Sequence, residues 1–487
     1  MKDKILNKLY ELTEAETLIL FLALALYLLW ASQVTFDRAG SSAPDERMRF
    51  LLPYFIYLYN RLPTGFDPEV IYGIGGWSYA FYPQFLGPIV SAFFMNLTHF
   101  IRGFNTENIL HLVYAARMTS VLSGITTVFF VNRTLRVLTE NERVSLLGMA
   151  LLAFWPQFAF LSSYINNDII SLAGISIMCY GTALSIKEQW TIKNAVILGI
   201  GMVICLLSYP FSYGFVLMFG VYFLISNGID IKEKRMEWKA FWKGFATVFI
   251  IVAVMCLPFL ARNALLYDGD IFGINSFNEA REEWEQTESM NWAYENARYW
   301  NETRDVPWND GIVFEWIESR TTFVYRGGYI STGNPYPGTL LELFQDRTWM
   351  ERTGKTAVTT TYFVFRDPFP DYFYYFYMIL LVIPLLAITQ LKKLEIKEKC
   401  FFAILLVGSL ITVALFLYST MTRDAQPQGR YFISVLIPLV MANAISLGVI
   451  LNPFSLRVQK LVVFSMIAIY GSLLFLVLRE FMMISGY

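Results

Sequence analysis

The succession of long apolar runs constrains this chain more than any other feature of its sequence. A transmembrane α-helix needs roughly 20 predominantly apolar residues to cross about 30 Å of hydrocarbon. Eleven runs, most of about that length, lie at about 16–35, 109–131, 144–164, 169–186, 193–209, 211–226, 242–261, 372–390, 400–420, 431–451 and 460–479. A segment in lipid must satisfy its own backbone hydrogen bonds, so these runs predict an all-α integral membrane protein with about eleven transmembrane helices.

The composition agrees with a membrane protein. The 487 residues are 56% hydrophobic and only 16% charged, whereas about a quarter of the residues in an ordinary soluble domain are charged. The net charge of −1 gives a polyanion little attraction, which argues against a nucleic-acid partner. The four cysteines all lie inside apolar runs, which argues against a disulfide framework.

The basic residues of the short loops predict the orientation. With a cytoplasmic N-terminus, all of them fall on the cytoplasmic side, in agreement with the positive-inside rule. They are Lys2, Lys4, Lys8, Arg133, Arg136, Arg143, Lys187, Lys193, Lys232, Lys234, Arg235, Lys239, Lys392, Lys393, Lys397, Lys399, Arg457 and Lys460. The first apolar run is too long for a signal-peptide core, so we expect it to be retained as a membrane anchor.

Two outer segments follow from this orientation. The stretch 85–100 is also apolar, but counting it as a span would invert every later loop. We therefore expect interfacial helices at 46–61 and 85–100 within a first outer loop, 36–108, that carries candidate catalytic residues. The predicted division is an N-terminal transmembrane module at 1–262, an outer domain at 263–370 and a C-terminal transmembrane module at 371–487.

The outer domain contains half of the 12 tryptophans of the chain. They are Trp284, Trp292, Trp300, Trp308, Trp316 and Trp349. Tryptophan is enriched at membrane interfaces, so one interpretation is an aromatic belt. The other is that sugars stack on these flat rings. The sequence leaves both open.

Two acidic motifs lie at the outer ends of predicted spans. Asp45 and Glu46 stand beside Arg47 and Arg49 and lead into an amphipathic stretch, an arrangement that suits general-base chemistry at a membrane surface. Asp168 closes the stretch 162–168, and a charge at the edge of hydrocarbon usually faces a cavity or a partner. The alternative for both motifs is helix capping, because Asp and Asn are good N-cap residues.

Two arginines also lie at the outer ends of spans, where the positive-inside bias does not explain them. They are Arg262 and Arg430. A lipid phosphate would satisfy a guanidinium at that depth through bidentate hydrogen bonds. The alternative is a salt bridge to Asp268, Asp270 or Asp424.

Four motifs, in this order, resemble those of the GT-C membrane glycosyltransferases, which use lipid-carrier donors. That superfamily includes protein O-mannosyltransferases, aminoarabinose transferases, oligosaccharyltransferases and their bacterial relatives. The motifs are Asp45-Glu46, the passage from Pro156-Gln157-Phe158 to Asp168, Arg262-Asn263 with Tyr267-Asp268, and Gln428-Gly429-Arg430-Tyr431. Two departures concern Arg47 and Arg49, where relatives often have a His, and Ser208-Tyr209, near which a Lys is common.

The resemblance implies a GT-C-like helical bundle in a bacterial cytoplasmic membrane, with an active site on the outer face. It implies a polyprenyl-phosphate sugar as donor and an extracytoplasmic glycan, lipid or protein as acceptor. Asp45 would be the base, with Glu46 and Asp168 positioning the acceptor or a divalent cation such as Mg²⁺ or Mn²⁺. The expected donor-phosphate ligands are Arg262, Arg430, Arg49 and Tyr431.

Two other classes of protein remain as alternatives. A transporter or flippase of lipid-linked sugars would also have many spans, but such proteins usually show internal repeats and broken helices near the midplane. A purely structural membrane subunit predicts no clustering of Asp45, Asp168, Arg262 and Arg430. The mutual positions of these four side chains therefore separate a structural subunit from the other two classes.

Overall fold

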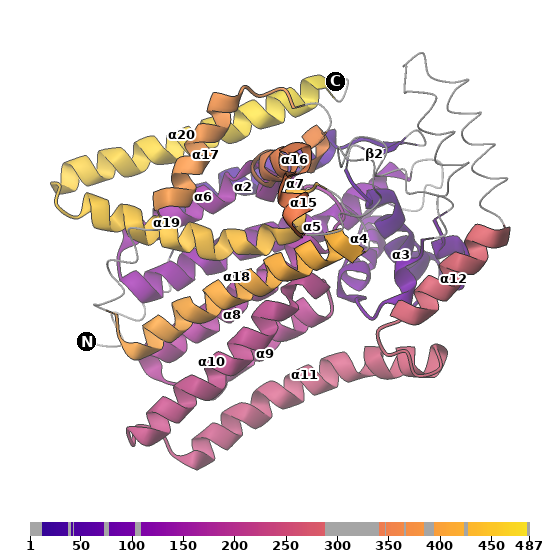
Figure 1. Cartoon of the computed structure of the whole chain (residues 1–487), viewed down its shortest axis with the longest axis horizontal. Helices are drawn as coiled ribbons and strands as arrows, with labels where there is room; N and C mark the ends of the chain where they lie inside the picture. The colour runs from indigo at the N-terminus through magenta and orange to yellow at the C-terminus, as the bar shows by residue number, and fades with distance from the viewer. Residues whose placement is uncertain are drawn as a thin grey trace.

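The computed structural model is a bundle of long α-helices with smaller elements gathered at one end (Figure 1). It describes residues 12–37, 40–41, 43–72, 77–102, 109–287, 340–345, 347–364, 367–383, 394–422 and 427–484. Strands occur in this part only as one short antiparallel pair, β1 (Phe36–Asp37) and β2 (Gly40–Ser41). The predicted all-α membrane class is confirmed.

Eight helical segments of the described chain are long and apolar enough to cross a membrane. Short 3-10 turns extend two of them, η3 (Pro210–Ser212) before α10 and η7 (Gly429–Val435) before α19. The eight helices are α2 (Glu14–Gln33), α5 (Leu110–Thr139), α8 (Asp168–Glu188), α10 (Tyr213–Lys232), α11 (Trp238–Leu266), α18 (Ile396–Thr422), α19 (Leu436–Leu451) and α20 (Leu456–Ile484).

Three of the eleven predicted spans do not form such helices within the described residues. The run 144–164 is divided into α6 (Glu142–Ala153) and α7 (Pro156–Leu161), because the ring of Pro156 starts a new helix. The run 193–209 yields α9 (Ile192–Leu206), which at 15 residues rises only about 22 Å. The run 372–390 begins as α17 (Asp371–Val382), and residues 384–393 lie outside the described residues. The count of eleven is therefore not reached.

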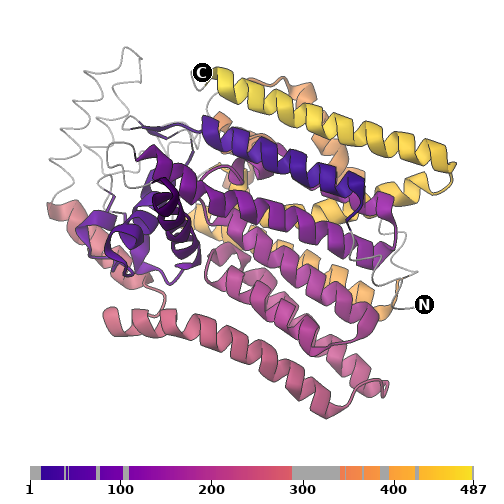
Figure 2. The ribbon, with the colours of Figure 1, turned by 180° about the vertical axis from the view of Figure 1, so that it is seen from behind.

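The predicted first outer loop contains the two helices that the sequence predicts, α3 (Glu46–Tyr59) and α4 (Leu86–Arg102). The 3-10 turns η1 (Pro68–Val70) and η2 (Tyr79–Phe81) connect them. Both views of the molecule show α3 and α4 at the same end of the bundle as α12 (Ile274–Thr287), which begins the predicted outer domain (Figures 1 and 2). The candidate acidic motifs thus belong to this end of the molecule.

Helix α8 lies at the centre of the bundle and α11 at its edge. In the most apolar stretch of each helix, 94% of the α8 residues but only 11% of the α11 residues are buried. Two glycines let α8 and α9 touch closely, since a Cβ on Gly174 would lie 2.8 Å from the carbonyl oxygen of Gly201. Asp168 is consequently held by a helix that protein surrounds, whereas α11 is left to face lipid.

The described end of the predicted outer domain packs onto the bundle through α15 (Leu340–Gln345), α16 (Arg347–Val358) and η5 (Thr361–Val364). The backbone N–H of Gly429 donates to Thr356 Oγ1 at 2.9 Å, and the indole of Trp155 donates to the Ala357 carbonyl at 2.9 Å. A Cβ on Gly429 would lie 2.4 Å from Ala357. Helix α16 therefore covers the turn that carries Arg430.

One of the six outer tryptophans can be placed. Trp349 is buried, and its ring stacks on Phe416 with centroids 5.7 Å apart. This residue packs in the interior and is neither part of an interfacial belt nor open to a sugar. The side chain of Trp284 and the whole of residues 292, 300, 308 and 316 lie outside the described residues, so both interpretations of those five remain predictions.

Candidate active site

Asp45 and Arg430 meet although 385 residues separate them in sequence. The guanidinium Nη2 of Arg430 donates to Asp45 Oδ2 at 2.5 Å. Asp45 precedes α3 in the left-handed conformation, with φ 59°, and its side chain makes no capping hydrogen bond. Asp45 thus occupies the N-cap position, as the capping alternative predicts, but its carboxylate does not cap the helix and binds Arg430 instead. Its carboxylate is 25% exposed while Arg430 is buried, so the pair is reachable from one side.

The surrounding charges set the protonation state of Asp45. Burial raises the pKa of its carboxyl, but the guanidinium groups of Arg430 and Arg49 outweigh that effect and hold the pKa below its ordinary value. Asp45 is consequently ionised at neutral pH and can accept a proton. A lowered pKa also makes it a weaker base while Arg430 stays in contact with it.

Arg49 lies one helical turn after Asp45 and turns toward the same place. Its guanidinium carbon is 5.1 Å from the centroid of the Tyr79 ring. Burial opposes the charge of Arg49, but the Tyr79 phenol and the carboxylates of Asp168 and Asp45 together raise its pKa above the ordinary value. The Nε of Arg49 has no hydrogen-bond partner among the described residues. Arg49 therefore interacts electrostatically with both carboxylates and has a donor unused.

Asp168 is the first residue of α8 and is 1% exposed. Asn166, rather than Asp168, caps the start of this helix: its amide oxygen accepts the N–H of Ile169 at 3.0 Å. Neither carboxylate oxygen of Asp168 has a hydrogen-bond partner in the part of the chain that the structure describes. A buried acceptor without a partner is unfavourable, and the nearby positive charges of Arg49 and Arg430 offset this penalty.

Glu46 has a different environment from Asp45. Its carboxylate is fully buried, and Arg117 binds it through Nε at 2.8 Å and Nη2 at 2.7 Å. Glu46 Oε1 also accepts the backbone N–H of Ile165 at 3.0 Å. Arg117 in turn donates to the carbonyls of Ala31 and Val34, at 2.7 and 3.0 Å. This Glu46–Arg117 clamp joins the end of α2, the start of α3, helix α5 and the loop before α8.

Arg430 and Tyr431 lie on η7 beneath α16. Besides Asp45, Arg430 Nη2 donates to the Tyr431 hydroxyl at 3.2 Å, and its guanidinium carbon is 5.0 Å from that ring. The Nε and Nη1 atoms of Arg430 have no hydrogen-bond partner in the described chain. Tyr209 lies within electrostatic reach of both Asp168 and Arg430. Two guanidinium groups with unused donors thus face two carboxylates.

Arg262 is held elsewhere. Its Nη2 donates to the carbonyl of Pro63 at 2.5 Å, and its guanidinium carbon is 5.1 Å from the Phe85 ring centroid. The charged groups that act on it most strongly are Tyr267 and, in the turn at 61–67, Asp67 and Arg61. The expected salt-bridge partner Asp270 instead accepts the N–H groups of residues 275 and 276, and Asp424 lies outside the described residues.

The structure therefore brings together four of the predicted site residues, Asp45, Arg49, Asp168 and Arg430, with Tyr431 at their edge. Among the described residues, no group of three His, Cys, Asp or Glu side chains is arranged to hold a metal ion. A divalent cation at this site stays a prediction.

Arg117 was missed by reasoning from sequence alone. The signal was present, because an arginine inside an apolar run usually has a buried partner or a function.

The chain is similar to known proteins in part of its sequence and in its fold. Residues 87–260, less than half of the chain, match the family model of dolichyl-phosphate-mannose-protein mannosyltransferases. No curated protein sequence matches the chain.

Several solved structures are similar. The apo oligosaccharyltransferase of Archaeoglobus fulgidus superimposes with a TM-score of 0.50 at 14% identity, over 95% of this chain and 55% of that one. ArnT from Cupriavidus metallidurans in the apo state gives 0.49 at 11% identity, over 91% of this chain and 60% of that one. AglB from Archaeoglobus fulgidus, in complex with an inhibitory peptide and a dolichol-phosphate, gives a TM-score of 0.48 at 14% identity, over 98% of this chain and 56% of that one.

At such identities the likeness concerns the fold, and this chain spans only 55–60% of the length of those proteins. The family model adds a likeness in sequence that includes Asp168 and its motif. The chain resembles the GT-C superfamily of membrane glycosyltransferases, as its motifs predict, in sequence over residues 87–260 and in fold over most of its length.

Proposed function

We propose that this chain is a GT-C-type glycosyltransferase of the bacterial cytoplasmic membrane. It moves a hexosyl or pentosyl group from a polyprenyl-phosphate donor to a hydroxyl of an extracytoplasmic acceptor, such as a cell-envelope glycan, a glycolipid or a protein. The observation that carries this proposal is the contact between Asp45 and Arg430, beside Arg49 and Asp168. A dolichyl-phosphate-mannose donor in the description of the matching family supports a lipid phosphate.

The two arginines suit the departing group. When a sugar leaves a polyprenyl phosphate, the phosphate is already an anion and needs a cation rather than a proton. Arg430 and Arg49 have three nitrogen atoms without hydrogen-bond partners in the described chain, and guanidinium groups bind phosphate oxygens bidentately. We assign the donor phosphate to these two side chains and to the hydroxyl of Tyr431.

Asp45 serves as the general base. It takes the proton of the acceptor hydroxyl while that oxygen forms a bond to the anomeric carbon. The bond from the anomeric carbon to the phosphate oxygen breaks, and its electron pair remains on the phosphate. A single displacement of this kind inverts the anomeric centre. It needs no second carboxylic acid, in contrast to a glycosidase, whose leaving group must be protonated.

Donor binding also activates the base. A phosphate that takes hydrogen bonds from Arg430 draws the guanidinium away from Asp45, which raises the pKa of Asp45 and strengthens it as a base. Glu46 keeps Asp45 in place through Arg117 rather than touching substrate. Asp168 accepts hydrogen bonds from sugar or acceptor hydroxyls, and it is the residue that, with Asp45, would hold a divalent cation when one is bound.

The test is mass spectrometry of envelope glycans and lipid-linked sugars from cells with and without the gene. Loss of one sugar from one envelope component, with accumulation of a polyprenyl-phosphate sugar, is expected. Complementation with Asp45→Asn should fail, whereas Glu69→Gln, an exposed carboxylate of the same loop, should restore the sugar. Restoration by Asp45→Asn, or accumulation of the lipid-linked sugar on the cytoplasmic side alone, would instead favour a transporter.

A further inference from the structure

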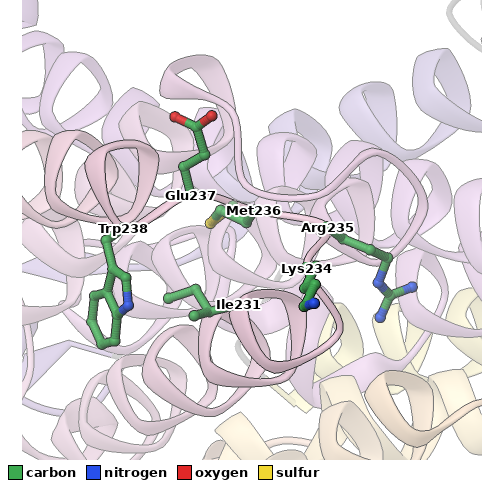
Figure 3. Close-up of a pocket in the computed structure, with 6 residues that line it drawn as sticks. All are labelled: Ile231, Lys234, Arg235, Met236, Glu237 and Trp238. Atoms are coloured by element: carbon green, nitrogen blue, oxygen red, sulfur yellow. The ribbon is translucent and has the colours of Figure 1, made fainter.

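A cavity of about 580 Å³ lies between α10 and α11, far from the Asp45 group. Ile231, Lys234, Arg235, Met236, Glu237 and Trp238 line it (Figure 3). The first end of α10 is next to the candidate site, because the rings of Phe211 and Tyr431 are 5.9 Å apart. The 20 residues of α10 rise about 30 Å, the thickness of the hydrocarbon. The cavity therefore opens at the opposite membrane face.

The turn that forms this cavity has an unusual residue at its most constrained position. The N–H of Arg235 bonds to the Asp230 carbonyl at 2.8 Å, and that of Lys234 to the Ile231 carbonyl at 3.0 Å. This is the pattern of a Schellman helix end, whose left-handed position usually holds glycine. Here Lys234 occupies it with φ 57°. Five other non-glycine residues of the described chain also have a positive φ, so the turn matters here because it places the side chain of Lys234 in the lining of the cavity.

The charges around the cavity leave an excess of unpaired cations. Asp230 is neutralised by Lys397 at 2.6 Å and by Arg235 at 3.2 Å, and Arg235 also contacts Glu233. In the described chain, four lysines between residues 232 and 243 have no carboxylate within ion-pair distance. They are Lys232, Lys234, Lys239 and Lys243. Glu237 is the remaining carboxylate of the lining, so positive charge dominates.

An exposed aromatic ridge leads from the cavity along α11. Trp238 is 62% exposed, Trp242 58% and Phe249 62%. Neighbouring rings touch in series, with centroids 5.6 Å apart for Trp242 and Phe245 and 6.3 Å for Phe245 and Phe249. The ridge belongs to the helix at the edge of the bundle (Figure 1). It begins at the membrane surface and continues into the hydrocarbon.

We propose that this cavity and ridge bind an anionic glycerophospholipid of the leaflet opposite the candidate site. The headgroup phosphate accepts hydrogen bonds from Lys234 and Lys239, and an acyl chain lies along the α11 ridge from Trp238 to Phe249. In the predicted orientation this leaflet faces the cytoplasm, where anionic lipids attract basic segments beside transmembrane helices. The inference does not depend on the proposed glycosyl transfer.

The experiment uses the full chain in nanodiscs made from equimolar phosphatidylglycerol and phosphatidylcholine, with retained lipids counted by native mass spectrometry. The wild type should retain phosphatidylglycerol preferentially. Each lysine removed should reduce that preference about fivefold at low salt. The variant is Lys234→Gly with Lys239→Gln, because glycine suits the positive φ of residue 234 and cannot weaken the turn. Trp238→Ala should shorten retention of the same lipid.

The matched controls remove the same groups from the first turns of α20, which lie at the same membrane face. Arg457→Gln with Lys460→Gln removes two exposed cations, and Phe464→Ala removes a 58% exposed ring. Both controls should keep the preference. If the controls lost the preference for phosphatidylglycerol as much as the variants do, general surface charge would explain the effect and the proposal would be overturned. So would a wild type without preference, or displacement of phosphatidylglycerol from this site by added undecaprenyl phosphate.

Discussion

At the scale of single residues, the contact between Asp45 and Arg430 couples the proposed base to the proposed phosphate ligand. Asp45→Asn keeps the shape of the side chain but cannot accept a proton. We expect transfer to fall by about 10²- to 10⁴-fold while the protein stays folded and still binds the lipid phosphate. Glu69→Gln is the control. Near wild-type transfer by folded Asp45→Asn protein would remove Asp45 from the reaction.

The second residue-scale prediction concerns pH. Arg49 helps to hold the pKa of Asp45 below its ordinary value, so Arg49→Gln should raise that pKa. Because the base must be ionised, kcat/KM is lost as the pH falls through this pKa, and the acidic limb should move to higher pH in the variant. Arg61→Gln, an exposed arginine paired with Asp67, should leave the limb in place. An unmoved limb in Arg49→Gln would mean that another group controls it.

The Glu46–Arg117 clamp gives a third prediction. Arg117→Met leaves a buried carboxylate without its cation and should lower the free energy of unfolding by about 3–5 kcal/mol. Adding Glu46→Gln removes the uncompensated charge and should recover most of that loss. Denaturant titration of the purified protein measures both. The same change at Arg61, whose pair is solvent-exposed, should cost no more than about 1 kcal/mol. Equal losses at the two sites would contradict the role of the clamp.

Sequence alone could predict much at this scale. Charged residues at the edge of the hydrocarbon usually have a partner or a function, and this singles out Asp45, Asp168 and Arg430. The partner of each could not be predicted, because Glu46 finds Arg117 across 71 residues and Arg430 finds Asp45 across 385. Arg262 shows the limit most plainly. Its motif and its predicted side of the membrane match those of Arg430, yet its guanidinium donates to the backbone carbonyl of Pro63.

At the scale of elements, the packing of α16 on η7 determines where Arg430 lies. Gly429→Ala would place a methyl group 2.4 Å from Ala357 and push the two elements apart. Overpacking of this kind usually costs about 1–3 kcal/mol, and here we expect binding of polyprenyl phosphate to weaken as well. Gly228→Ala is the control, since a Cβ there meets nothing within 4 Å and alanine favours the helix. Unchanged phosphate binding in Gly429→Ala would show that η7 tolerates the shift.

Helices were easier to predict than their boundaries. Apolar runs located all eight long helices, because lipid-spanning length and hydropathy decide them together, but the predicted ends differ by up to eight residues, as at the end of α5. Hydropathy does not register a local break, so the run 144–164 was predicted as one span although Pro156 begins a new helix inside it. Hydropathy also does not predict how much of each helix is buried by protein. Helix α11 is the more apolar of the two, with a mean hydropathy of 2.5 against 1.8 for α8, but only α8 is surrounded by protein.

At the scale of the whole molecule, the positive-inside pattern predicts which face each loop occupies. Reporter fusions after Glu140 and after Lys234 should report cytoplasm, and fusions after Asn60 and after Asp270 should report the outside. All four residues lie at the ends of described helices or in the turns that follow them, where truncation leaves the preceding helix whole. A cytoplasmic signal after Asn60 would reverse the sidedness of the candidate site and of the lipid cavity together.

The separation of Asp45 and Arg430 in sequence also orders events during synthesis. At about 5–20 residues per second, about 20 to 80 s pass between the appearance of the aspartate and that of the arginine 385 residues later. The Glu46–Arg117 clamp can close early, since only 71 residues divide its partners. A chain still emerging from the ribosome therefore holds Asp45 and Arg49 without Arg430, the second guanidinium of the proposed phosphate site. Under the proposed function, it cannot act on lipid-linked sugars until Arg430 and the helices that follow it are in the membrane.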